Sequence, residues 1–167
     1  MRVVKFVCIM IPLLTNMSLQ SKAHTNPEQK KQDQYSQLKN WIDSKQYRFH
    51  AISATTKYGR SIQPSGDYFL ELNNNLLSMD LPYYGRSYST VYPGTDVGIE
   101  FNTLEFTYIA DTAKKGGWEI TVLPKNESNA SKISMSVTTS GYCTLSVSSN
   151  SRQPISYYRI IIANTKH

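Results

Sequence analysis

Short segments of alternating polar and apolar residues, each ended by a turn signal, dominate the chain after residue 45. In "DYFLEL" the side chains of Tyr68, Leu70 and Leu72 share one face, because successive side chains of a strand point to opposite faces. The same alternation recurs in "LLSMDL", "WEITVL", "KISMSV" and "YCTLSV". Turn residues separate the segments, such as "NNN" at 73–75 and "TSG" at 139–141. Roughly eight or nine such strands predict a mainly β, antiparallel sandwich or barrel, a lipocalin-like barrel included.

One helix is predicted before the strands. Tyr35, Leu38 and Ile42 recur at spacings of three and four, with Trp41 beside them, which makes one apolar stripe on a polar helix. The pattern ends near Ser44, so we expect this N-terminal helix to cover one end or face of the sheet. Helices between the strands are not predicted, which excludes a parallel α/β fold.

The first residues have the pattern of a secretory leader. Arg2 and Lys5 flank the apolar run "FVCIMIPLL", and Ser21 and Ala23 follow with the small-x-small spacing of a cleavage site. The run is too short to cross a bilayer, which needs roughly 20 apolar residues. A buried N-terminal helix is the alternative, but no second apolar face would pair with it. We therefore predict a signal peptide over residues 1–23.

The cysteines bear on how the mature chain is held. Cys8 lies inside the apolar run, too early for attachment of a lipid, so we expect an unlipidated protein. Removal of the leader leaves Cys143 alone, and an intramolecular disulfide cannot form. Cys143 alternates with Leu145 and Val147, which predicts a small buried side chain on one strand face.

Charge and organisation narrow the class of protein further. The 18 basic and 12 acidic residues give +6, but three basic residues precede residue 24, so 15 basic and 12 acidic residues leave +3. The remaining Lys and Arg are spread along the chain, and nucleic acid is therefore not an expected partner. We predict a flexible, polar start at 24–34 and one β-rich domain at 35–167, with no transmembrane segment after removal of the leader.

The stretch "LPYYGRSYSTVYPG" at 81–94 is the most unusual part of the sequence. Exposed tyrosines beside an arginine would form a platform for stacking and hydrogen bonding to a glycan or peptide. Alternatively, the segment crosses from one sheet to the other and its rings close the end of the fold, with the Arg86 guanidinium bound to carbonyls or to an acid such as Asp80. This interpretation is favoured for Leu81, Pro82, Gly85 and Arg86, because a bend requires that chemistry. The candidate ligand-binding residues are Tyr83, Tyr84, Arg86, Tyr88 and Tyr92.

These residues also carry a resemblance. "LPYYGRSY", with "YRFHAISA" and "DYFLEL" before it and "KKGGWEITV" and "SGYCTLSV" after it, resembles domain-of-unknown-function family 4251, a family of exported Bacteroidetes proteins. The resemblance covers residues 38–162, and Leu81–Arg86 is its most specific part. It implies a compact β-rich domain in the cell envelope and no assigned activity. Many relatives resemble lipoproteins, whereas this leader lacks the lipid signal, and Arg159 lies near a position where relatives tend to carry glycine.

Few residues indicate catalysis, and no catalytic residue, metal site or cofactor is predicted. His24, His50 and His167 are not spaced as ligands, and His50 alternates with buried-type neighbours, so it is expected to face solvent. A G-x-S-x-G sequence does not occur. Two facing carboxylates could hydrolyse a glycoside, and the strand acids are Glu71, Asp80, Glu100, Glu105 and Glu119.

One further site follows from the family resemblance. "DTA" at 111–113 matches the Asp-Thr-aliphatic pattern for O-glycosylation in Bacteroidetes envelope proteins, which implies a glycan on Thr112.

Together these features predict an exported, non-catalytic envelope protein, located in the periplasm or at the outer membrane. The leading hypothesis is a binding module whose tyrosine-rich stretch contacts a glycan, a peptide or an envelope component. A structural or assembly protein that binds another protein through an exposed strand edge is the alternative. A hydrolase that uses paired strand carboxylates is the second alternative.

Overall fold

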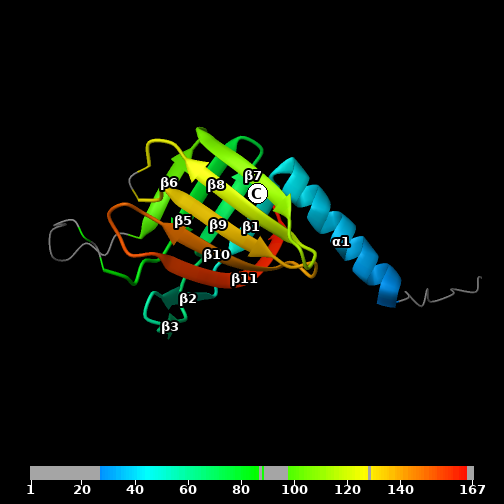
Figure 1. Cartoon of the computed structure of the whole chain (residues 1–167), viewed down its shortest axis with the longest axis horizontal. Helices are drawn as coiled ribbons and strands as arrows, with labels where there is room; N and C mark the ends of the chain where they lie inside the picture. The colour runs from blue at the N-terminus through cyan, green and yellow to red at the C-terminus, as the bar shows by residue number, and fades with distance from the viewer. Residues whose placement is uncertain (1–26, 87, 89–97, 128, 165–167) are drawn as a thin grey trace, which may run out of the picture.

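The computed structural model describes residues 27–86, 88, 98–127 and 129–164. Its antiparallel sheet curls into a nearly closed barrel, and one helix lies at one end (Figure 1). The predicted leader and Tyr92 lie outside the described residues. The strands are β1 (Gln46–His50), β2 (Ser53–Thr56), β3 (Ser61–Ile62), β4 (Phe69–Asn73), β5 (Leu76–Leu81), β6 (Ile99–Thr103), β7 (Phe106–Thr112), β8 (Trp118–Pro124), β9 (Lys132–Val137), β10 (Tyr142–Ser148) and β11 (Ile155–Ala163).

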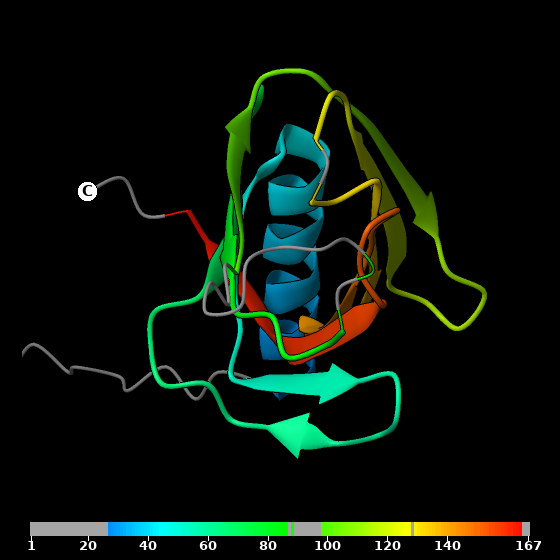
Figure 2. The same cartoon turned by 90° about the vertical axis from the view of Figure 1, so that its left-hand side faces the viewer.

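The order of the strands explains why the barrel is nearly closed. Neighbours follow the order β6-β5-β4-β1-β11-β10-β9-β8-β7, and every pairing is antiparallel. Strands β6 and β7 are consecutive in the chain, yet they stand at opposite ends of this order. The short hairpin β2–β3 branches from β11 and lies outside the barrel wall (Figure 2). The mainly β prediction is confirmed.

The core fills the barrel with alternate side chains of the strands. On β8, Trp118, Ile120 and Val122 are buried, as their alternation predicts. On β10, Cys143 is buried with the other residues of its face, which confirms its prediction as a small core side chain. Burial raises the pKa of the Cys143 thiol, so this sulfur stays protonated and inert.

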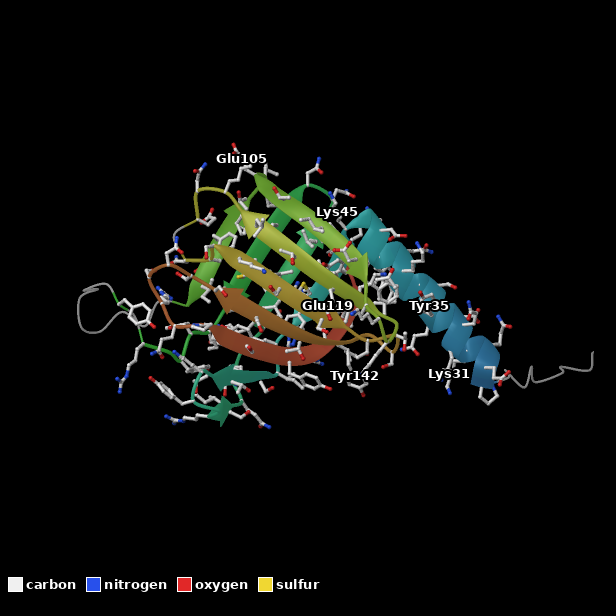
Figure 3. The ribbon with its side chains drawn as sticks, in the orientation of Figure 1. Lys31, Tyr35, Lys45, Glu105, Glu119 and Tyr142 are labelled. Atoms are coloured by element: carbon white, nitrogen blue, oxygen red, sulfur yellow. The ribbon has the colours of Figure 1, made fainter. Side chains whose placement is uncertain are left out.

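The helix α1 (Pro27–Ser44) begins earlier than predicted. Residues 27–34 are helical rather than a loose start, so the predicted boundary at Tyr35 is wrong. Only Leu38 and Ile42 of the helix are buried, while the Tyr35 ring stacks on Trp118 at a centroid distance of 5.1 Å. Figure 2 looks into the barrel with the helix behind it, and Figure 3 labels Tyr35 where the helix meets the barrel.

The turns follow the predicted chemistry. Asn74 has a φ of 54° in the turn between β4 and β5, a conformation that asparagine tolerates well. Gly141 has a φ of 85° in the turn before β10. In the described part of the chain, no helix has both the length and the apolar character that a membrane span requires.

Candidate ligand-binding site around the tyrosine loop

The tyrosine-rich stretch follows β5 at the end of the barrel away from the helix (Figure 1). We call its described residues, 82–86 and 88, the tyrosine loop. The loop lies between the hairpin β2–β3 and the segment 149–154 that connects β10 to β11 (Figure 2). Two segments distant in sequence therefore frame the loop.

Hydrogen bonds fix the path of the tyrosine loop. The buried Tyr157 hydroxyl donates to the carbonyl of Pro82 at 2.7 Å. Farther along, the Gln153 amide donates to the carbonyl of Arg86 at 3.1 Å, and the Tyr88 amide donates to a carbonyl of the same segment at 2.7 Å. The backbone of the loop is thus held near residue 82 and again at residues 86 and 88, which gives its exposed side chains defined positions.

Tyr83 stabilises the conformation of the loop. Its hydroxyl lies 2.9 Å from the Arg86 carbonyl and 3.0 Å from the Gln153 carbonyl, and it donates its hydrogen to this pair. The Arg152 guanidinium lies over the ring, 5.0 Å from its centroid. Burial raises the pKa of Tyr83. A Cβ on Gly85 would lie 2.3 Å from the Tyr83 hydroxyl, so glycine is needed where that ring packs.

The other described residues of the predicted site face outward. Tyr84 is 38% exposed and Tyr88 is 65% exposed. Arg86 is exposed as well, and within the described residues its guanidinium has neither a carboxylate nor a carbonyl partner. The predicted contact between Arg86 and Asp80 is therefore not made in the described structure.

An acidic cavity of about 220 Å³ is lined in part by Tyr84. Asp80 on β5 and Glu100 on β6 are register partners, so their side chains project from the same face of the sheet. In the described chain neither carboxylate has a basic partner. The cavity is lined by Tyr68, Asp80, Pro82, Tyr83, Tyr84, Gly98 and Glu100.

A second, basic cavity, also of about 220 Å³, is lined by Tyr84 as well. Arg86 of the tyrosine loop and Arg60 at the end of the hairpin turn both line it. Gln153, which is 9% exposed, contributes a buried amide. The cavity is lined by Thr56, Tyr58, Arg60, Tyr84, Gly85, Arg86 and Gln153.

The remaining candidate carboxylates lie elsewhere. Glu71 contacts Arg48 at 3.4 Å, and Glu119 accepts a hydrogen bond from Ser136 at 2.7 Å. Glu105 lies in the turn before β7, far along the strand ladder from Glu119 (Figure 3). Only Asp80 and Glu100, of the five strand acids, line a common cavity among those described.

His50 differs from its prediction, because it lies half-buried in a polar cluster. Its Nδ1 is 2.7 Å from the Arg159 guanidinium, which only donates, so Nδ1 accepts and Nε2 carries the proton. Nε2 contacts Asp67, which also pairs with Arg48 at 3.1 Å. This cluster links β11, β1 and the approach to β4. Metal binding is not indicated: no group of three or more His, Cys, Asp or Glu is placed for it in the described chain.

The contribution of the hairpin β2–β3 to the site is not among the features predicted from the sequence. A signal was available, because the triplet Tyr-Gly-Arg occurs twice, at 58–60 and at 84–86. Both copies line the basic cavity. By contrast, the pairing of Asp80 with Glu100 depends on the register of β5 and β6, and no local pattern reveals it.

Comparison with known proteins places the chain in a family. No curated protein matches it. A crystal structure of a DUF4251 family protein from Bacteroides eggerthii is similar, with 14% identity and a TM-score of 0.56 over 78% of this chain and 88% of that chain. At this identity the likeness shows a shared fold. The model of the family described as "Domain of unknown function (DUF4251)" matches residues 29–159. The chain therefore belongs to the DUF4251 family, as the resemblance in its sequence predicted.

Proposed function

We propose that this protein is an exported, non-catalytic binding module of the cell envelope. In this proposal the tyrosine loop contacts a glycan, a peptide or another envelope component. The observation that carries it is the position of Tyr84, an exposed residue that lines both an acidic and a basic cavity on a loop with a fixed backbone. Aromatic faces with convergent polar groups are typical of ligand sites.

The side chains around the loop support binding better than catalysis. Asp80 and Glu100 line one cavity, and in the described residues no hydrogen bond holds either carboxylate in a fixed orientation. Catalytic carboxylates require a defined position relative to the reacting bond. Tyr84, Arg86 and Tyr88 require only accessibility to act as a recognition surface.

The test is co-sedimentation of the purified protein with insoluble envelope polysaccharide and with peptidoglycan. We expect Tyr84→Ala and Tyr88→Ala to weaken binding and to leave the thermal unfolding midpoint nearly unchanged, because both rings are exposed. Tyr142→Ala is the matched control, since Tyr142 is 49% exposed on β10, away from the loop (Figure 3). Equal loss in the control, or no loss in either loop variant, would contradict the proposal.

Hydrolysis is the second candidate function, and the Asp80–Glu100 pair favours it. Directly opposed residues of an antiparallel pair have Cβ atoms about 4.5–5.5 Å apart, which lets the two carboxyl groups reach the separation of about 5–9.5 Å found between the carboxyl groups of glycosidases. The test is release of reducing ends from envelope polysaccharide. Release that disappears in both Asp80→Asn and Glu100→Gln would establish catalysis in place of simple binding.

A role in assembly has support from strand β7. It is an end strand of the described sheet, and its last four residues are exposed, with Ile109 at 45%. An unpaired edge of this kind can accept an extended segment of another protein. Concentration-dependent association that Ile109→Lys abolishes would favour this role.

Export and glycosylation have separate tests. Thr112 is exposed at the end of β7, so its side chain is accessible for attachment of a glycan. N-terminal sequencing of the native protein should begin at His24, and its intact mass should exceed that of the unmodified mature chain. An uncleaved N-terminus would contradict export through this leader, and an unmodified mass would remove the glycan on Thr112.

A further inference from the structure

The two Tyr-Gly-Arg triplets meet across one cavity. Residues 58–60 form the turn of the hairpin β2–β3, where Gly59 has a φ of 79°. Residues 84–86 belong to the tyrosine loop, which follows β5. Both tyrosines and both arginines line the basic cavity, which we call the YGR cavity. Two segments that are separated in the chain by more than one strand therefore each contribute a tyrosine and an arginine to the same cavity.

The arginines of the YGR cavity differ from the other described arginines in their surroundings. Arg48 pairs with carboxylates, Arg159 donates to His50, and Arg152 donates to the Gly98 carbonyl. By contrast, the guanidiniums of Arg60 and Arg86 have no carboxylate or hydrogen-bond acceptor among the described residues. Two uncompensated guanidiniums at one cavity attract an anion, and their planar donors match a carboxylate or phosphate.

The rest of the cavity lining includes a polar side chain, Gln153, and two aromatic side chains, Tyr58 and Tyr84. The Gln153 side chain is nearly buried, and its Nε2 donates to the Tyr58 hydroxyl at 3.4 Å. Tyr58 and Tyr84 are 73% and 38% exposed. Drug-sized ligands occupy pockets of about 300–1,000 Å³, so a cavity of about 220 Å³ takes one small group or one residue of a longer ligand.

We propose that the YGR cavity binds the carboxylate of an acidic sugar residue, with Arg60 and Arg86 as its ligands. This inference rests on the proposed binding function and names the class of ligand. The acidic cavity, which also includes Tyr84 in its lining, discriminates among anionic ligands, because Asp80 and Glu100 repel a ligand that is negative along its whole length. A saccharide with one carboxylate avoids this repulsion, since its neighbouring hydroxyls donate hydrogen bonds to those acids and its ring packs on the tyrosines.

The test is a titration of the ¹⁵N-labelled protein followed by amide chemical shifts. The probes are methyl glucuronide and methyl glucoside, which differ at the carboxylate. We expect the glucuronide to shift amides at 57–60 and 84–86 and to bind about tenfold more tightly than the glucoside, as charge-assisted hydrogen bonds imply. Added NaCl should reduce this difference. Arg60→Gln and Arg86→Gln should each lower the affinity for the glucuronide to about that of the glucoside.

Lys57→Gln is the matched control, because it removes one positive charge from the same hairpin but does not line the cavity. It should leave the affinity for the glucuronide nearly unchanged. Equal affinities for the two glycosides, independent of both arginines, would overturn the anion site and leave the binding function of the loop intact. Tighter, arginine-dependent binding of inorganic phosphate or of a tetraglutamate peptide would overturn the assignment to a sugar. The absence of shifts at 57–60 and 84–86 with every probe would overturn the site itself.

Discussion

Gly85→Ala tests how the tyrosine loop is built. A Cβ at this position would lie 2.3 Å from the Tyr83 hydroxyl and 2.6 Å from the adjacent ring carbon, so the ring must move. Movement of the ring breaks the hydrogen bond that the Tyr83 hydroxyl shares between two carbonyls. It also breaks the cation–π contact between the ring and the Arg152 guanidinium. A hydrogen bond contributes about 0.5–1.5 kcal/mol and an exposed cation–π contact about 0.5–1 kcal/mol, so we expect destabilisation of about 1–2.5 kcal/mol.

The measurement is thermal and urea unfolding followed by circular dichroism. A loss of this size lowers the unfolding midpoint of a domain of this length by about 3–12 °C. The decisive comparison is a double-mutant cycle with Tyr83→Ala, which removes the ring that the new methyl group meets. In that background Gly85→Ala should cost less than about 0.5 kcal/mol. An equal cost in both backgrounds would refute the clash with Tyr83 as the reason for glycine.

Three further perturbations test other parts of the structure. Tyr157→Phe leaves the buried Pro82 carbonyl without its donor at 2.7 Å, so unfolding by urea should show a loss of about 1–3 kcal/mol. Burial raises the pKa of Tyr108 to about 12, so above pH 10 the unfolded state releases its proton first and stability should fall by up to about 1.4 kcal/mol per pH unit. Tyr108→Phe should make this decline shallower in unfolding curves at pH 9 to 11. Tyr35→Ala removes the stacking on Trp118 and should change the tryptophan fluorescence while the strand signal in circular dichroism persists.

The strand faces could be predicted because alternation is a local property. Spacing alone predicts that Cys143, Leu145 and Val147 share the buried face of β10, and the structure buries all three. The start of the helix could not be found in the same way. Residues 27–34 are polar on every side, so they carry no apolar periodicity, whereas the stripe from Tyr35 onward does. Such polar residues are compatible with a helix, but their sequence gives no sign of where the helix begins.

The role of each tyrosine in the loop needed the tertiary structure. Tyr83 and Tyr84 are adjacent and chemically identical, yet Tyr83 packs within the loop and Tyr84 faces two cavities. The difference arises from Gln153, whose carbonyl lies 3.0 Å from the Tyr83 hydroxyl although it is 70 residues away. A local pattern contains no information on such a partner.

The sequence by itself determined the antiparallel β class, the buried faces of the strands, the turns and the family, because these depend on residues close together in the chain. Only the tertiary structure decided that the sheet curls into a nearly closed barrel and that β6 and β7 form its ends. It also brought Arg60 to Arg86 and Asp80 to Glu100. Such pairings are set by strand register and by the packing of distant segments, and the free energy that selects them comes from burial of the whole core.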